Sequence, residues 1–270
     1  MQNYDALYRI YAYVRHMLTA WNTTGEGIHS PYLFHLVSFV LRDKNRFYAF
    51  PDIERRREAL LNDTRVLEVV DYGSGGSPEG LHVQRKVCDI ARGHLENATV
   101  GQMLFRLVNF LSQDVKRPLE ILELGTSLGI TTAYLAMPNS QNKVMTLEGS
   151  SAVAKVAREQ WQALRLTNIE CVEGRIEDTL LIRARERLDL AYVDANHTYE
   201  ATRQYVEYLL PRLTEKGIIA IDDIHYSREM ERAWKVLQED ERVTSSMDMG
   251  YIGLLFVDKH YLKRHYRLRL

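Results

Sequence analysis

Two acidic residues flank a short glycine loop in a pattern that could hold a charged ligand containing a ribose. Glu123 stands two residues before Gly125, and Gly129 closes a Gly-x-x-x-Gly loop. Glu148 lies 19 residues past Gly129. In dinucleotide-binding units a carboxylate at this spacing accepts hydrogen bonds from ribose hydroxyls. The carboxylate of Glu123 would repel a pyrophosphate and would favour a ligand with an ammonium group.

The spacing of the glycine loop and the two carboxylates beside it distinguish between two ribose-containing cofactors, NAD and S-adenosylmethionine. A dinucleotide-binding loop has the spacing Gly-x-Gly-x-x-Gly, whereas this loop reads Gly-Thr-Ser-Leu-Gly. A cationic amino acid joined to a ribose describes S-adenosylmethionine, so the loop predicts that cofactor rather than NAD. The glycine spacing alone also fits a tight turn between a strand and a helix. The second acid in register favours the cofactor site.

A second group of acids follows two later apolar runs. Asp194 ends one run, and Asp222 and Asp223 end the next. Three carboxylates at neighbouring strand ends repel one another unless a cation or protons compensate, and oxygen-rich sites suit magnesium. Two interpretations stay open: the three acids bind Mg²⁺, or Asp222 or Asp223 caps the next helix while Asp194 faces the cofactor. His197, three residues past Asp194, is a candidate general base.

Strands and helices that alternate along the chain must position these residues. Seven apolar runs have the length of strands, at residues 119–124, 143–148, 169–173, 188–194, 217–222, 243–249 and 251–257. Helical spacing predicts helices between them, including 130–137, 151–166, 198–210 and 227–239. This alternation predicts right-handed βαβ units, and the tight connection of the last two runs predicts an antiparallel pair. The expected fold is α/β: a Rossmann-like, doubly wound, mostly parallel seven-stranded sheet with an antiparallel last strand and an N-terminal helical region.

A second glycine-rich stretch, from Asp71 to Gly76, also follows an apolar run. Pro78 and Gly80 come next, and no apolar strand ending in an acid lies about 20 residues further on, as a ribose-binding unit would require. This stretch therefore predicts a loop near the mouth of the active site and not the cofactor loop. Aromatic residues in the N-terminal helices, such as Tyr8 and Phe39, predict that these helices cover the strand ends and form a substrate pocket.

Charge and composition limit the partners and the compartment. The chain has 35 basic and 36 acidic residues, so no overall field recruits nucleic acid or an anionic membrane. Cys88 and Cys171 form no Cys-x-x-Cys pair, which fits a reducing cytoplasm. No apolar stretch approaches the roughly 20 residues of a membrane span, and no signal peptide is recognised. We expect a soluble cytoplasmic protein whose oligomeric state is open, with a homodimer as one alternative.

Three stretches of the chain resemble the class I S-adenosylmethionine-dependent methyltransferases. They read ILELGTSLGITTAYLA, VDANHTYE and GIIAIDDIHY, and the resemblance covers about residues 100–258. Within the class the chain looks most like the catechol and caffeoyl-CoA O-methyltransferase branch and related bacterial methyltransferases. The resemblance implies an S-adenosylmethionine-binding methyltransferase domain over residues 116–258, after a helical cap and substrate region over 1–115 and before a basic tail over 259–270.

By position, the resemblance implies a role for each residue of these motifs. Glu123, Gly125 and Ser127 would line the methionine end of the cofactor, with Thr131 near its carboxylate. Glu148 would hold the ribose, and Ile176 and Glu177 would lie beside the adenine. The complete expected cofactor set is Glu123, Gly125, Thr126, Ser127, Gly129, Thr131, Glu148, Gly149, Gly174, Ile176, Glu177 and Asp194.

The resemblance also bears on the metal and the base. In the metal-dependent members, an Asp at the position of Asp194 and an Asp-Asn pair at that of Asp222 and Asp223 bind magnesium. A lysine at the position of His197 acts on the substrate hydroxyl. This chain therefore departs twice, with Asp223 in place of the Asn and His197 in place of the Lys. The first change keeps an oxygen ligand, and the second places a side chain that titrates near neutral pH where a base is needed.

Together these patterns predict a methyltransferase that acts on the oxygen of a small hydroxylated acceptor. His197 and Asp194 are the expected catalytic residues, with Asp194, Asp222 and Asp223 as the expected ligands if magnesium takes part. Two alternatives stay open: a module that binds S-adenosylmethionine without catalysis, and an NAD-dependent oxidoreductase.

Overall fold

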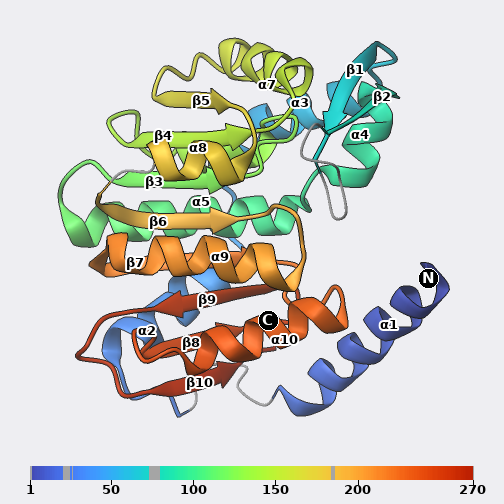
Figure 1. The fold of residues 1–270 in the computed structure, drawn as a ribbon. Helices are drawn as coiled ribbons and strands as arrows, with labels where there is room; N and C mark the ends of the chain where they lie inside the picture. The colour runs from blue at the N-terminus through green and yellow to red at the C-terminus, as the bar shows by residue number, and fades with distance from the viewer. Residues whose placement is uncertain (1, 21–24, 26, 73–79, 184–185, 270) are drawn as a thin grey trace. The chain divides into compact units, whose positions relative to one another are not determined.

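The computed structural model describes residues 2–20, 25, 27–72, 80–183 and 186–269. The chain divides into two compact units. The central unit is Asp43–Ala184, and the terminal unit combines Met1–Arg42 with Arg185–Leu270. Each unit has its own strands and helices (Figure 1).

Three parallel strands form the main sheet of the central unit. They are β3 (Glu120–Leu124), β4 (Lys143–Glu148) and β5 (Ile169–Glu173), in the order β3-β4-β5. The helices α6 (Ile130–Ala136), α7 (Ser151–Ala163) and α8 (Ile176–Arg183) follow these strands in turn. Because the strands are parallel, the residues after their carboxyl ends share one edge of the sheet. Glu148 lies opposite Glu173 at that edge.

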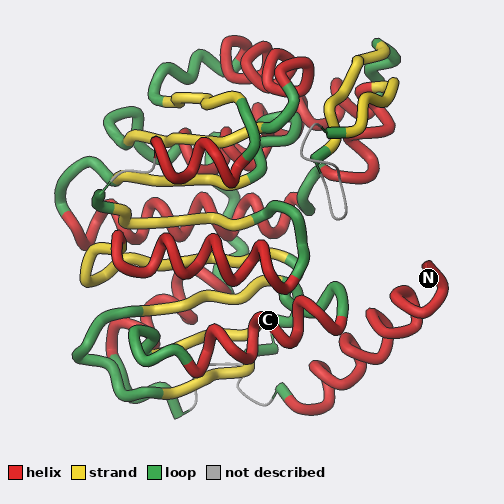
Figure 2. Tube along the Cα trace, viewed as in Figure 1, coloured by secondary structure: helices red, strands yellow, loops and turns green. Residues whose placement is uncertain are grey.

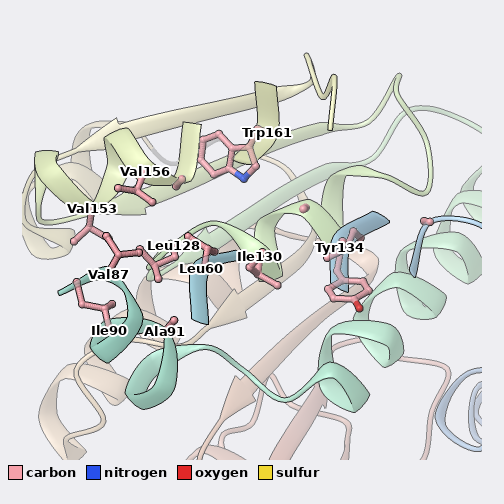
Figure 3. Packing of buried hydrophobic residues seen from close by; sticks show 14 of the residues in the cluster. Leu60, Val87, Ile90, Ala91, Leu128, Ile130, Tyr134, Val153, Val156 and Trp161 are labelled. Atoms are coloured by element: carbon pink, nitrogen blue, oxygen red, sulfur yellow. The ribbon is translucent and has the colours of Figure 1, made fainter. Parts of the chain in front are cut away.

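A single cluster of buried side chains joins α6 and α7 to helices that precede the sheet in the chain. These helices are α3 (Phe50–Leu61), α4 (Val87–His94) and α5 (Ala98–Val115). Figure 3 shows Val153, Val156 and Trp161 of α7 near Leu128, which leads into α6. Tyr134 of α6 is fully buried, and its hydroxyl donates a hydrogen bond to Glu54 Oε1 at 2.6 Å. The helices before β3 thus share the core of the strand–helix units.

The glycine-rich stretch that begins at Asp71 belongs to a hairpin. The strand β1 (Val66–Asp71) pairs with β2 (Leu81–Lys86) in antiparallel register. A cofactor loop of the predicted kind follows a parallel strand and leads into a helix, so this geometry agrees with its assignment to another loop. Residues 73–79, which include most of the loop expected at the mouth of the active site, lie outside the described residues.

The terminal unit contains a mixed sheet in the order β10-β8-β9-β7-β6. Its strands are β6 (Leu188–Val193), β7 (Leu213–Asp222), β8 (Ser245–Asp248), β9 (Ile252–Phe256) and β10 (Arg264–Arg267). β6 and β7 are parallel, whereas β9 is antiparallel to both β7 and β8. β10 runs parallel to β8.

Helices of the terminal unit begin at clear capping residues. The unit contains α1 (Gln2–Thr19), α2 (Pro31–Leu36), the π-helical turn Val37–Leu41, α9 (Tyr199–Leu209), the short turn Leu210–Arg212 and α10 (Arg228–Glu239). The Ser30 hydroxyl accepts from the Leu33 amide, with Pro31 in the first turn of α2. Figure 2 shows how helices and strands alternate along the chain.

No helix of the described ranges combines the length and apolar character needed to cross a membrane.

The predicted α/β fold class is confirmed. All seven predicted strands are present as β3 to β9, most of them parallel, and β9 is antiparallel to its neighbours. Three strands were not predicted: the hairpin strands β1 and β2, and β10 within the stretch that was expected to be a basic tail. β10 escaped prediction because its basic side chains hide the alternation in which Tyr266 is buried between more exposed neighbours.

Candidate functional site

The glycine loop after β3 has a left-handed backbone at three positions. The φ angles are 96° at Gly125, 48° at Ser127 and 79° at Gly129, which precedes α6. The amides of Gly125 and Thr126 both donate to the Leu147 carbonyl of β4, at 3.1 and 3.3 Å. The loop is therefore fastened to the neighbouring strand, and its glycines supply conformations that other residues adopt at a cost.

Gly129 also lies against the buried indole of α7. The Trp161 Nε1–H donates to the Gly129 carbonyl at 2.8 Å. A Cβ atom added at Gly129 would lie 2.7 Å from Trp161 Nε1 and 2.8 Å from Ala157 Cβ. Both the positive φ and the close packing thus require glycine at this position.

We predict that Gly129→Ala lowers the free energy of unfolding by about 2–4 kcal/mol, from backbone strain and overpacking. Gly93→Ala is the matched control, because it lies in α4 with no atom within 4 Å of an added Cβ. That change should raise the free energy of unfolding by about 0.5–1 kcal/mol, since alanine favours a helix interior. Urea denaturation followed by circular dichroism measures both. Equal stability of the two variants would contradict this account of the loop.

Glu123 is buried at the end of β3 and is oriented by hydroxyl groups. Thr132 and Thr146 both donate to its Oε2 atom, Thr146 at 2.6 Å. Thr126 and Thr146 share a further hydrogen bond between their hydroxyls at 2.6 Å. Thr131, in the first turn of α6, is also buried. Two of the predicted cofactor residues, Glu123 and Thr126, are therefore joined through the Thr146 hydroxyl.

Glu148 ends β4 and accepts hydrogen bonds from two backbone amides. The Ser127 amide donates to Oε2 and the Ser150 amide donates to Oε1, each at 2.9 Å. Burial raises the pKa of Glu148 to about 7, although these amides and that of Gly149 act in the opposite direction. The glycine loop and the acid that were predicted to hold one ligand are thus in direct contact.

Two further parts of the central unit border this acid. The amide of Gly174, which follows β5, donates to the Glu148 carbonyl at 2.9 Å, and Ile176 and Glu177 begin α8. A Cβ atom at Gly149 would lie 2.7 Å from Tyr72 Cδ2, so the Tyr72 ring lies against Gly149. Sequence reasoning missed Tyr72 because nothing in its local pattern links the β1 hairpin to β4. Every predicted cofactor residue except Asp194 belongs to the central unit.

The predicted catalytic residues lie at strand ends of the terminal unit. Asp194 follows β6, and its Oδ1 lies 3.3 Å from His197 Nε2. His197 has a left-handed φ of 44°, and its ring lies 6.1 Å from that of Tyr226. Burial raises the pKa of Asp223. Asp194 raises this pKa further, whereas His197 and Arg9 lower it. The structure therefore brings Asp194, His197 and Asp223 into one electrostatic group.

The alternatives for the acids separate on geometry. Ser227 caps α10, because its hydroxyl accepts from the Met230 amide, so the interpretation that Asp222 or Asp223 caps this helix is wrong. Carboxylate oxygens of Asp194 and Asp222 lie within 4.8 Å of each other, which is close enough to share a cation. Within the described residues, Asp223 is not part of that group. Two of the three predicted magnesium ligands are therefore suitably placed.

Residues 122–224 match the protein family described as "Methyltransferase domain". The matched segment contains the glycine loop, Glu148, Asp194 and the acid pair after β7. It therefore includes almost all residues that were selected from the sequence for chemistry.

The similar curated proteins are arginine–tRNA ligases, and the likeness is confined to a short segment. The ligase of Haemophilus ducreyi is 29% identical over 96 residues, which are 35% of this chain and 16% of that protein. The ligase of Histophilus somni is 31% identical over 94 residues, 34% of this chain and 15% of that protein. The matched segment is thus only about a sixth of the length of these relatives, and their activity is not assigned to this chain.

Solved structures share the fold over most of the chain. Cofactor-bound Rv0187 from MTB has a TM-score of 0.57 at 19% identity, over 81% of this chain and 94% of that one. The O-methyltransferase from Bacillus cereus in complex with SAH has a TM-score of 0.55 at 19% identity, over 79% and 92%. TomG from Streptomyces achromogenes, in complex with SAM, has a TM-score of 0.54 at 17% identity, over 79% and 91%.

The family match and the shared fold bear on the class of protein. One segment of the chain matches a methyltransferase domain, and the chain shares the Rossmann-like fold of solved methyltransferases, as its sequence motifs predicted.

Proposed function

We propose that this protein transfers a methyl group from S-adenosylmethionine to a hydroxyl oxygen of a small acceptor molecule. The observation that carries the proposal is the direct contact between Glu148 and the glycine loop through the Ser127 amide. This contact supports a role for Glu148 in accepting ribose hydroxyls and for the adjoining loop in lining the methionine end. The match to a methyltransferase domain and the SAM- or SAH-bound neighbours support the same cofactor.

Two groups of residues would divide the work of the reaction. S-adenosylmethionine supplies a methyl group that its sulfonium centre activates for in-line displacement. The central unit would bind it through Glu148 and the loop, while residues after β6 and β7 would handle the acceptor. A hydroxyl is a weak nucleophile, so a base must take its proton or a cation must stabilise the oxyanion. His197, oriented by Asp194, is the proposed base, and Asp194 and Asp222 would be the ligands if Mg²⁺ takes part.

The alternatives are less well supported. An NAD-dependent oxidoreductase would have the Gly-x-Gly-x-x-Gly spacing and no carboxylate before its loop, whereas this chain has a buried Glu123 there. A non-catalytic module that binds S-adenosylmethionine would share the binding residues. It would not need an ion-paired Asp194 and His197 at the strand ends of the terminal unit.

Calorimetric titration of the full chain with S-adenosylmethionine, S-adenosylhomocysteine and NAD tests the cofactor. We expect both adenosyl ligands to bind and NAD not to bind. Transfer of tritium from methyl-labelled S-adenosylmethionine to a panel of catechols, phenols and sugars then tests the reaction. Binding without transfer to any hydroxylated compound would favour the non-catalytic module, and binding of NAD alone would overturn the proposal.

We further propose that the helices of the N-terminal region contribute to acceptor binding. Phe34 and Phe39 near α2, and Tyr11 on α1, are exposed aromatic side chains that suit contact with an apolar acceptor. Phe39→Ala should raise the KM for the acceptor several-fold and leave S-adenosylmethionine affinity unchanged. Leu262→Ala, also an exposed apolar residue of the terminal unit, is the control. Equal KM values for both variants would contradict this role.

A further inference from the structure

Three buried side chains of the terminal unit bring nitrogen and oxygen ligand atoms together, away from the residues discussed above. His16 of α1, His225 after β7 and Asp248 of β8 are only 6%, 7% and 3% exposed. Asp248 Oδ1 lies 3.4 Å from His16 Nδ1, and Asp248 Oδ2 lies 3.0 Å from His225 Nε2. One ligand atom from each residue falls within 4.8 Å of the others.

The hydrogen bond of His16 fixes which of its nitrogens bears a proton. His16 Nε2 lies 2.9 Å from the Leu268 carbonyl oxygen, which can only accept, so Nε2 carries the hydrogen. In a neutral ring Nδ1 then has a lone pair, and this lone pair faces the carboxylate of Asp248. Nδ1 is buried and has no hydrogen-bond partner within the described residues. A cation between Nδ1 and the carboxylate would satisfy both groups.

His225 has a comparable arrangement on the opposite side of Asp248. Its Nδ1 is buried without a hydrogen-bond partner in the described parts of the chain and lies 3.9 Å from Glu231 Oε2. In the structure Nε2 lies at hydrogen-bond distance from Asp248 Oδ2, 3.0 Å, and donates to this carboxylate. If a metal ion took the place of that proton, the proton of the neutral ring would lie on Nδ1, facing the Glu231 carboxylate, and the lone pair of Nε2 would be directed at the ion beside Asp248. Both histidines would then turn a lone pair toward the same carboxylate.

Glu231 is held as a carboxylate by several neighbours. Arg15 donates two hydrogen bonds to it, at 3.0 and 2.8 Å, Tyr8 donates another, and Lys235 Nζ lies 2.6 Å from Oε1. Burial raises the pKa of Glu231, but these contacts outweigh it and bring the pKa to about 2. Glu231 thus offers a fixed acceptor for the outer nitrogen of His225.

We propose that His16, His225 and Asp248 form a binding site for a divalent transition-metal ion, with zinc as its occupant. Metal-bound histidines usually donate their other N–H to a carbonyl or carboxylate. The Leu268 carbonyl fills this role for His16, and Glu231 Oε2, 3.9 Å from His225 Nδ1, would have to approach that ring to do the same. Ligand atoms around tetrahedral zinc lie roughly 3.3 Å apart, given zinc–ligand distances near 2.0 Å. The three ligand atoms lie within 4.8 Å of one another, and the 3.4 and 3.0 Å separations run to the two different oxygens of Asp248, so a small closure of the three side chains would bring them to that value.

Two other groups also contact Asp248. The Gly250 amide donates to Oδ1 at 2.9 Å, and Arg267 Nε lies 3.5 Å from Oδ2 with its side chain 38% exposed. Arg267 Nη1 also donates to the Thr19 hydroxyl at 2.8 Å, so this side chain has a partner besides Asp248. The site would join α1 to β8 and to the segment after β7, and it shares no residue with the acids Asp194, Asp222 and Asp223.

The test is metal binding by the full chain after chelator treatment. Zinc or cobalt is titrated into the protein, and the number of metal ions bound per chain is measured by elemental mass spectrometry. We expect one tight ion per chain, with the visible absorption of cobalt in an imidazole–carboxylate site. His16→Ala, His225→Ala and Asp248→Asn should each weaken binding at least about 100-fold, while far-ultraviolet circular dichroism confirms folding.

The control variant is His260→Ala, which removes a ligand from the more exposed group of Glu215, Asp258 and His260. It should leave the tight ion in place. Nitrogen-15 NMR spectra of the histidine rings test the site in the unmutated chain. Zinc should change the chemical shifts of His16 Nδ1 and His225 Nε2. The proposal is overturned if the chain binds no zinc or if zinc leaves the chemical shifts of these two nitrogens unchanged. It is also overturned if, of the four variants, only His260→Ala loses the ion.

Discussion

Glu148→Ala is expected to weaken S-adenosylmethionine binding at least about tenfold, since charge-assisted hydrogen bonds to ribose hydroxyls are lost. The fold should persist, because the carboxylate contacts only local amides of the loop and of the turn after β4. Calorimetry measures the change in Kd. Glu173→Ala is the control, because Glu173 lies opposite Glu148 in the sheet but pairs with Arg158 at the surface. Unchanged affinity in Glu148→Ala would remove Glu148 from the cofactor site.

The pH dependence gives a second measurement on the same residue. With the pKa of Glu148 raised to about 7 by burial, the carboxylate form is depleted below that pH. Affinity should therefore rise with pH through about 7 and level off above it, and Glu148→Gln should abolish this dependence. In the absence of ligand, the effect of pH on the stability of the fold has the opposite sign to its effect on ligand affinity. Between 4.5 and about 7 the folded state binds more protons at Glu148 than the unfolded state does, so its contribution to stability falls as pH rises.

His197→Ala is expected to lower turnover roughly 10²–10⁴-fold, the usual loss when a general base is removed. Its Nε2 contacts Asp194 Oδ1 at 3.3 Å, which would orient the ring toward the acceptor. With His197 as the base, turnover should be insensitive to chelator. His94→Ala is the control, because this histidine is exposed at the end of α4 in the central unit.

A magnesium-dependent reaction would give a different set of results. Chelator would then abolish turnover, added Mg²⁺ would restore it, and Asp222→Asn would be severely impaired. Activity that resists chelator and also survives His197→Ala would contradict both mechanisms. Positioning of the two reactants would then be the remaining source of catalysis.

The sequence predicted the strand–helix units accurately because their signals are local. The parallel strands β3, β4 and β6 are short apolar runs that are largely buried on both faces, and each is followed by a turn and a helix. The contact of Glu148 with the glycine loop follows from the parallel register of β3 and β4. A spacing pattern could therefore place both groups at one edge of the sheet.

Contacts between distant segments could not be predicted in this way. His16 and Asp248 are 232 residues apart in the chain, and no local period links α1 to β8. Tyr72 likewise meets Gly149 only because the hairpin of β1 and β2 packs beside β4. At Asp223 the local signal was misleading: an acid before a helix suggests a cap, but Ser227 is closer to the first turn and occupies that position.

The short strand β10 has a consequence for the behaviour of the protein at high concentration. A strand at the end of a sheet exposes unpaired amides and carbonyls that can recruit another chain. β8 is entirely buried and would otherwise present its backbone as an unpaired edge, but β10 covers it with four residues that include Arg264 and Arg267. A short edge strand with positive charges repels the identical edge strand of a neighbouring molecule. The basic residues near residue 264 thus protect the sheet against intermolecular strand pairing and aggregation.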